Sequence, residues 1–134
     1  MKQSVVTVLA CLAALTMCAR RHGEIFEVPF GYKGWVEVIY SASCTPARVT
    51  ADGHRVLRIA ADGRLCTGSP WEEGTAIDEF FYVDGARRYP LHEETPHTGR
   101  IWGRSTIKRD RHKELVERFF VGTEPEYRRE TLMR

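Results

Sequence analysis

Three Asp-Gly pairs divide the middle of this 134-residue chain into short segments. They are Asp52-Gly53, Asp62-Gly63 and Asp84-Gly85. An Asp-Gly pair between apolar segments is typical of a type I′ hairpin turn, because both central residues of that turn need a positive φ. The pairs therefore predict hairpins and a fold built from short strands.

The segments beside these pairs are short and rich in β-branched and aromatic residues, which is typical of strands. The predicted strands are residues 24–28, 35–40, 54–60, 79–83, 87–91 and 115–121, although the apolar spacing of the last segment would also suit a helix. Residues 101–107 are a candidate for one more strand. Towards the end of the chain Thr123 stands three residues before Glu126, which is the spacing of a capping box, and predicts a helix over residues 124–133. We predict a mostly β fold, a small antiparallel β-sandwich with a short C-terminal helix.

The chain begins with a basic residue, Lys2, followed by an apolar run over residues 5–17 that carries no charge. That run is shorter than the roughly 20 residues that a membrane-spanning helix needs. A basic start and a short apolar run are typical of a secretory signal peptide. The segment Leu15-Thr16-Met17-Cys18 resembles a bacterial lipobox, although Met17 stands where a small residue is usual.

We therefore predict a lipoprotein signal peptide over residues 1–17, a lipid on Cys18, an anchor or linker over residues 18–23 and a single β-rich domain over residues 24–134. Cleavage after Ala19 is the alternative. The predicted location is the bacterial cell envelope, with the protein held to a membrane by its lipid.

Two further cysteines, Cys44 and Cys66, form an even pair in a chain predicted to be exported. Such a pair is most simply a disulfide. Closing a loop of roughly twenty residues contributes about 3 kcal/mol in the chain-entropy model. Zinc binding and a nucleophilic role are disfavoured, because neither cysteine belongs to a C-x-x-C pair or has a histidine at ligand spacing.

The overall charge balance, 20 Lys and Arg against 18 Asp and Glu, gives no reason to expect nucleic acid as a partner. Basic residues are nevertheless dense after residue 99: Arg100, Arg104, Lys108, Arg109, Arg111 and Lys113, with Asp110 as the acid among them. This stretch is either a surface for an acidic partner or lipid headgroups, or a solvated loop. Trp71 and Trp102 fall in predicted loops beside charged residues. The predicted binding residues are Trp71, Trp102, Arg100, Arg104, Arg109 and Arg111, since Trp and Arg are enriched at interface hot spots.

No catalytic motif stands out, and we predict neither a cofactor nor a metal. The segment from His92 to His97 differs from the H-E-x-x-H motif, because its histidines are five residues apart and Pro96 intervenes. The alternative is a loop metal site made by His92, Glu93 and His97. The acidic run of Glu72, Glu73, Asp78 and Glu79 could hold paired carboxylates, or be a solvated loop.

Two segments resemble the signatures of a family of uncharacterised bacterial lipoproteins. The opening segment is Pro29-Phe30-Gly31-Tyr32-Lys33-Gly34-Trp35-Val36, and the closing one is Phe119-Phe120-Val121-Gly122-Thr123-Glu124-Pro125-Glu126-Tyr127. Between them Phe80-Phe81-Tyr82-Val83-Asp84-Gly85 resembles the family's strand-turn pattern. The resemblance implies an envelope location and a β fold, and it implies no mechanism.

The function that these observations favour is a non-enzymatic, lipid-anchored envelope protein whose β domain binds another protein, as an inhibitor or immunity protein does. One alternative is a small-ligand or glycan-binding module that uses Trp71 and Trp102 as platforms. The other is a metal-assisted hydrolase that uses His92, Glu93 and His97.

Overall fold

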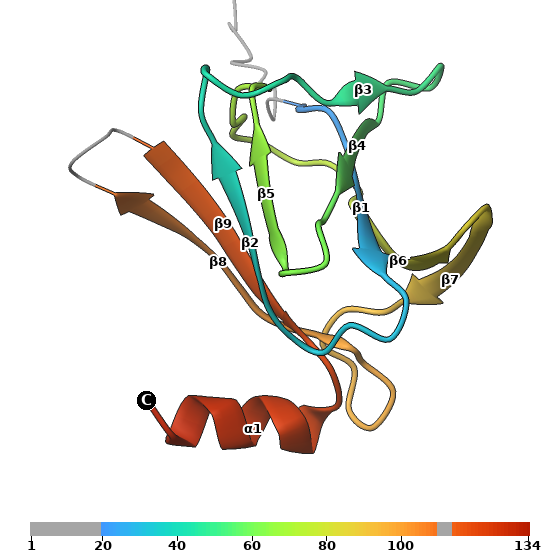
Figure 1. Cartoon of the computed structure of the whole chain (residues 1–134), viewed down its shortest axis with the longest axis vertical. Helices are drawn as coiled ribbons and strands as arrows, with labels where there is room; N and C mark the ends of the chain where they lie inside the picture. The colour runs from blue at the N-terminus through green and yellow to red at the C-terminus, as the bar shows by residue number, and fades with distance from the viewer. Residues whose placement is uncertain (1–19, 110–113) are drawn as a thin grey trace, which may run out of the picture.

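The computed structural model describes residues 20–109 and 114–134 (Figure 1). The elements are β1 (Glu24–Pro29), β2 (Gly34–Tyr40), β3 (Arg48–Val49), β4 (Arg55–Arg58), β5 (Arg64–Thr67), β6 (Glu79–Asp84), β7 (Arg87–Leu91), β8 (Ile101–Arg109), β9 (Glu114–Val121) and α1 (Glu124–Leu132). The predicted signal peptide and the predicted lipid site at Cys18 lie outside the described residues, as does Arg111.

The described strands form two sheets, one in the order β3-β4-β1-β6-β7 and one in the order β5-β2-β9-β8. This confirms a mostly β fold with a short helix at its C-terminal end. The sheets are mixed rather than antiparallel throughout, because β1 pairs in parallel with β4 and β6, and β2 pairs in parallel with β5. Consecutive strands β1 and β2 belong to different sheets, so each takes neighbours from later in the chain.

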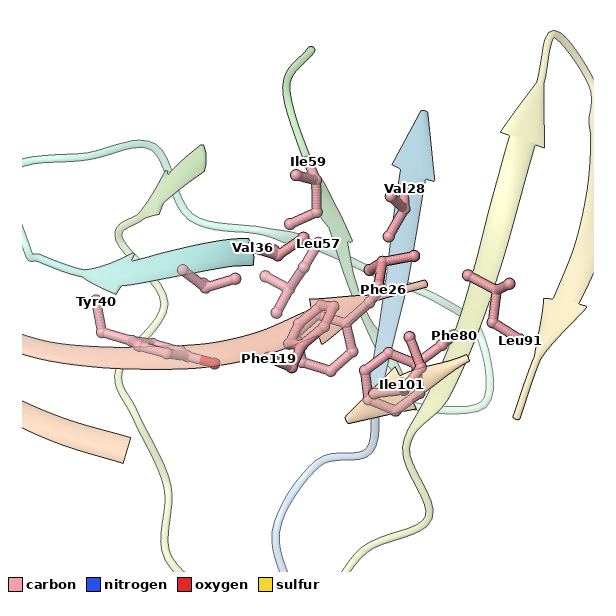
Figure 2. Close-up of a cluster of buried hydrophobic side chains, with 12 residues drawn as sticks. Phe26, Val28, Val36, Tyr40, Leu57, Ile59, Phe80, Leu91, Ile101 and Phe119 are labelled. Atoms are coloured by element: carbon pink, nitrogen blue, oxygen red, sulfur yellow. The ribbon is translucent and has the colours of Figure 1, made fainter. Parts of the chain in front are cut away.

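The two sheets pack face to face on a core of alternating inward side chains (Figure 2). Phe26 of β1 stacks on Phe80 of β6 with ring centroids 4.7 Å apart. Both rings meet the edge of Phe119 from the other sheet, at 5.2 and 5.1 Å. All three side chains are almost fully buried. Such aromatic contacts contribute about 0.5–1.5 kcal/mol per pair beyond the burial of apolar area.

The Asp-Gly turns differ in detail from the type I′ prediction. Among described residues other than glycine, His97 alone has a positive φ, so Asp52, Asp62 and Asp84 lie in the ordinary region of backbone space. Asp52-Gly53 and Asp84-Gly85 do join the antiparallel pairs β3–β4 and β6–β7. The Asp62-Gly63 turn joins no hairpin: it carries the chain from β4 in one sheet to β5 in the other.

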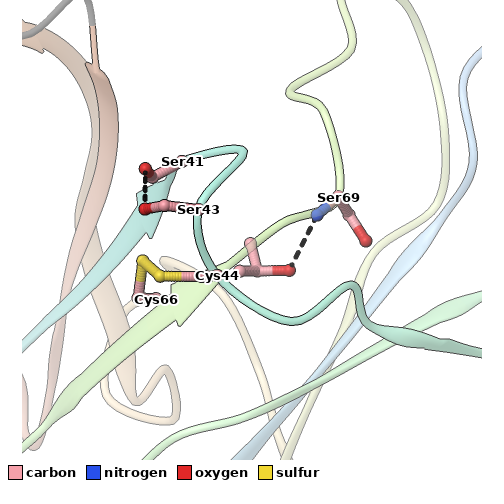
Figure 3. The surroundings of a disulfide bond; sticks show 6 residues. Ser41, Ser43, Cys44, Cys66 and Ser69 are labelled. Atoms are coloured by element: carbon pink, nitrogen blue, oxygen red, sulfur yellow. Dashed lines mark hydrogen bonds between the residues drawn. A yellow bond between two sulfur atoms is a disulfide. The ribbon is translucent and has the colours of Figure 1, made fainter.

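The disulfide between Cys44 and Cys66 is present, with Cα atoms 5.8 Å apart (Figure 3). It ties the loop after β2 to the edge strand β5, which is only four residues long. Cysteine counting therefore predicted the bridge correctly, and its position explains how so short a strand is held at the edge of its sheet.

The capping box is also confirmed at the start of α1. The Glu126 backbone N–H donates to Oγ1 of Thr123, and the Glu126 carboxylate accepts from the Thr123 backbone N–H at 2.8 Å. These two bonds satisfy N–H groups that the first turn of a helix leaves without partners. Within residues 20–109 and 114–134, no helix combines the length and the apolar character that crossing a membrane requires.

Candidate functional site

A β-bulge in β8 decides which side chains reach the space between the sheets. Trp102 pairs with Phe120 of β9, and the register resumes at Ser105 opposite Arg118. Gly103 and Arg104 therefore face a single residue of β9. Gly103 has a φ of 60°, which suits the left-handed glycine of a bulge. The extra residue breaks the strand alternation, so that Trp102 and Arg104 lie on opposite faces of the sheet.

Trp102 turns to the outer face of the four-stranded sheet, where α1 lies. It forms an outer aromatic cluster with Trp35, Phe120 and Tyr127. The Trp102 ring stacks on Tyr127 at 6.0 Å, and its Nε1 donates to the carbonyl of Gly122 at 3.0 Å. The prediction that Trp102 lies in a loop and offers a binding platform is wrong, because the side chain lies in β8 and is buried.

Arg104 turns to the inner face, where its guanidinium lies 5.4 Å from the ring centres of Phe26 and Phe80. Its Nη2 lies 2.6 Å from Oδ2 of Asp78 and its Nε lies 2.5 Å from Oε1 of Glu117. Sequence reasoning proposed Arg104 as a surface residue, whereas the structure makes it the centre of a buried charge network.

That network is the inner polar cluster, made of Arg21, Glu24, Tyr40, Asp78, Arg104 and Glu117. Arg21 holds both carboxylate oxygens of Asp78, at 2.8 and 2.6 Å. Burial alone would raise the pKa of Asp78, but hydrogen bonds from Arg21, the Glu24 backbone and Arg104 outweigh it and lower that pKa. Asp78 and Glu117 thus carry the charge that matches Arg21 and Arg104.

Tyr40 joins two carboxyl groups with one hydroxyl. Its Oη lies 2.9 Å from Oε2 of Glu24 and 2.9 Å from Oε2 of Glu117. Burial and the two carboxylates raise the pKa of Tyr40, so the phenol keeps its proton. One hydroxyl proton cannot be donated to two carboxylates, so closing both contacts requires a second proton on one carboxyl group.

Glu24 is the group that holds this second proton. Burial, and next the negative charge of Glu117, raise the pKa of Glu24 to about 7. Glu117 instead forms an ion pair with Arg104, whose Nε lies 2.5 Å from its Oε1. In the neutral form Glu24 donates to Tyr40 and Tyr40 donates to Glu117, so both contacts of the Tyr40 hydroxyl are hydrogen bonds.

The inner polar cluster opens into a cavity of about 380 Å³. Glu24, Arg104 and Glu117 line it from the strands, and Trp71 and Glu73 line it from the loop that precedes β6. Trp71 lies in a loop, as predicted, and packs against the core. The structure therefore brings together two of the predicted binding residues, Trp71 and Arg104, at one cavity.

The other predicted residues lie apart from this cavity. Arg100 donates to the carbonyl of Gly99 at 2.9 Å, and Arg109 pairs with Glu37 at 3.4 Å at the far end of β8. The basic side chains of this stretch that the structure describes are thus divided between the inward-pointing Arg104 and the two ends of β8.

The histidines and acids of the alternative sites do not meet as a metal site. Among the described residues, no group of three or more His, Cys, Asp or Glu side chains is arranged to hold a metal ion. This applies to His92, Glu93 and His97. Of the acidic run, Glu72 and Glu73 line the cavity and Asp78 lies in the inner polar cluster, while Glu79 is exposed.

Arg21, Glu24, Tyr40 and Glu117 are the site residues that the sequence analysis did not select. Glu117 carried a detectable signal, because it lies two residues before Phe119 in a strand whose inward positions are otherwise apolar. Glu24 carried a weaker one, as a charge at the first position of β1.

Comparison with known proteins gives a family and a fold. The model of a family of unknown function, DUF6843, matches residues 20–128. A crystal structure of a "Putative Lipoprotein" from Bacillus anthracis is similar, with a TM-score of 0.56 at 18% identity over 73% of this chain and 68% of that chain. At that identity the likeness shows a common fold. No curated protein matches the chain.

Proposed function

This chain belongs to a family of unknown function, DUF6843, and we propose that it is a lipid-anchored protein of the bacterial envelope that binds a small ligand without catalysing a reaction. The envelope location is supported by the signal-peptide pattern and by Cys18. A disulfide is typical of an oxidising compartment, which supports export. The similar fold of a protein named a lipoprotein agrees with this location.

The observation that carries the ligand-binding proposal is the convergence of Trp71 and the inner polar cluster on one cavity. Small-molecule sites are typically concave and combine an aromatic or apolar wall with a few placed polar groups. Here Trp71 is the wall, and Glu24, Arg104 and Glu117 are the polar groups. A buried carboxyl group with a shifted pKa beside a cavity is also typical of functional sites.

Ligand-observed NMR with the low-molecular-mass fraction of the native envelope tests this function. We expect signals from bound molecules to appear with the wild type and to be lost with Trp71→Ala. Ile77→Ala is the matched control, because Ile77 lies in the same loop, is 80% exposed and does not line the cavity. Equal signals with Trp71→Ala and the wild type would place the ligand elsewhere.

The anchor is tested separately by fractionation of cells. Cys18→Ser removes the only atom to which the proposed lipid would be attached, so we expect this variant in the soluble fraction. Continued sedimentation of Cys18→Ser with membranes would contradict the anchor.

A second candidate function, binding of another envelope protein, is favoured by a different surface. Phe30 is 59% exposed and contacts Tyr82 and Tyr89, with ring centroids 5.8 and 5.3 Å apart. Exposed aromatic groups are enriched at protein interfaces. Cross-linking in the native envelope separates the two functions: a protein partner lost with Phe30→Ala but retained with Trp71→Ala would favour this one.

A further inference from the structure

We propose that the cavity beside Trp71 binds an organic cation with N–H donors, a primary ammonium or a guanidinium group, and that Glu24 and Glu117 receive it. This inference names the ligand class of the proposed function and therefore rests on it. Three features support a cation: the charge balance at the cavity, an unused carboxyl oxygen, and the proton shared through Tyr40.

The charge balance at the cavity is negative. Arg21 and Arg104 line it, but Asp78 and Glu117 match their two charges. Glu72 on the rim is matched by Arg55 at 2.5 Å. Within the described residues, Glu24 and Glu73 form no ion pair, so a ligand entering the cavity meets unmatched carboxyl groups.

An anion would find few free donors there. Arg104 already gives its Nε to Glu117, its Nη2 to Asp78 and its Nη1 to Glu93. The remaining Nη hydrogens of Arg104 lie beside the carboxylates of Asp78 and Glu117, so an anionic ligand there would meet like charge.

Glu24 offers an acceptor that the fold leaves unused. The residue is 4% exposed and lines the cavity. Its Oε2 contacts Tyr40, whereas its Oε1 has no hydrogen-bond donor among the described residues. Because Oε1 is not fully buried, it is open to the cavity, and an N–H group of a ligand can donate to it.

Because a proton is shared through Tyr40, the inference predicts that binding of a cation releases a proton. The second proton of Glu24, Tyr40 and Glu117 is held because two carboxylates lie near one hydroxyl. A bound cation supplies the positive charge in place of that proton. One cation enters and one proton leaves Glu24 for solvent, so binding releases a proton near neutral pH. Trp71 adds an aromatic face, which also attracts cations.

Isothermal titration calorimetry with ethylammonium chloride tests the inference on the folded, disulfide-bonded protein. Titrations in two buffers of different ionisation enthalpy give the number of protons released. We expect binding with a fractional proton released at pH 7, a number closer to one at pH 6, and none at pH 9, where Glu24 is already ionised.

Two other salts sharpen the ligand class. Tetramethylammonium carries the same charge without N–H donors, so we expect binding at least tenfold weaker than for ethylammonium. Sodium acetate should not bind. Glu24→Gln should weaken ethylammonium at least tenfold and abolish the proton release, while Glu79→Gln, an exposed carboxylate outside the cavity, should change neither.

Three results would overturn the inference: binding of acetate in place of ethylammonium, ethylammonium binding without proton release at pH 6 and 7, or equal binding by Glu24→Gln and the wild type. The first of these leaves the proposed ligand-binding function standing with an anion as ligand. Absence of any Trp71-dependent ligand in the envelope fraction contradicts the function itself, so the two failures are distinct. The proton count uses the wild type and does not depend on how any variant folds.

Discussion

The inner polar cluster and the outer aromatic cluster grow from neighbouring residues of one strand. Trp102 and Arg104 lie on either side of Gly103, and the bulge at that glycine sends one side chain outward to Tyr127 and the other inward to Asp78. The outer cluster is built from ring contacts that no change of pH near neutrality alters. The inner cluster is built from charges and shared protons.

This difference indicates which part of the protein is less stable than an ordinary apolar core. The outer aromatic cluster fixes α1 against the sheet through contacts between rings. The inner polar cluster keeps a carboxyl group half-neutralised beside a cavity, which is less stable than an apolar filling of the same space. A region that gives up stability in this way is where we expect function.

Removing the charge at the centre of the inner cluster should have the largest effect. Arg104→Met leaves Glu117 buried without its cation and leaves Asp78 with Arg21 alone, so we expect a loss of about 3–5 kcal/mol in the free energy of unfolding, measured by urea denaturation. The control is Arg109→Met on the same strand, whose pair with Glu37 is partly exposed and contributes less than about 1 kcal/mol. Equal losses in both variants would show that the inner network is no different from a surface pair.

The two clusters should also differ in their response to pH. The pKa of Glu24 is raised in the folded state to about 7 from an ordinary value of 4.5, so its contribution to stability is complete below pH 4.5 and is lost as the pH rises through 7. The wild type should therefore lose about 3 kcal/mol of this contribution between pH 5 and pH 8.

Glu24→Gln keeps a neutral group at this position and should not show that loss. The measurement is the difference in free energy of unfolding between wild type and variant at pH 5, 6, 7 and 8, which cancels the titration of the histidines common to both. A difference that stays constant with pH would mean that Glu24 ionises normally in the folded protein.

Substitution of Gly103, the glycine between the two clusters, should destabilise the protein for a steric reason. A Cβ at Gly103 would lie 2.7 Å from Oη of Tyr127, whereas a Cβ at Gly85, which has a similar φ, would meet no atom within 4 Å. We expect Gly85→Ala to lose about 1 kcal/mol from backbone strain alone and Gly103→Ala to lose about 2–3 kcal/mol. Thermal denaturation with near-ultraviolet circular dichroism, which reports on Trp102, measures both. Similar losses would mean that Tyr127 moves aside freely.

The smallest effect should be confined to the outer side of the molecule. Thr123→Ala removes the N-cap of α1 and should lose about 1 kcal/mol. The substitution keeps the Thr123 backbone N–H, whose hydrogen bond, together with Lys33, lowers the pKa of Glu126 to about 2. Hydrogen exchange should rise in the first turn of α1 and stay unchanged at Tyr40. Faster exchange at Tyr40 would show that the helix supports the inner cluster.

Local sequence signals predicted most of the elements. Strand alternation located β1, β2, β4, β6, β7, β8 and β9, and the Thr123–Glu126 spacing located α1 to within a residue of its end. The sequence analysis did not predict β3 and β5. These strands are two and four residues long, too short to show an alternating pattern, and they are defined by the strands they pair with. The sequence analysis did not predict the parallel pairings either. Each of them joins two strands between which the chain passes through the other sheet, so the paired strands are not consecutive in the sequence.

The site was predictable only by residue type. Trp71 and Arg104 were selected because such side chains bind ligands, yet Arg104 acts as a buried partner of Asp78 and Glu117. Trp102 was misplaced because one extra residue in β8 reverses which side chains point inward, and a glycine alone does not reveal a bulge. Glu24 and Glu117 lie more than ninety positions apart, so no local pattern could have joined them.

The pairing of β2 with β9 has a consequence for how the chain folds during synthesis. The centre of the four-stranded sheet joins Gly34–Tyr40 to a strand that ends at Val121, so this sheet cannot form until nearly the whole chain is available. Contacts between such distant segments make folding slow, and the apolar faces of the earlier strands stay uncovered while the last one is awaited. A chain emerging amino end first must therefore remain unfolded until late. We therefore expect a product truncated before β9 to be degraded by proteases, because the apolar face of β2 has no partner strand in the centre of its sheet.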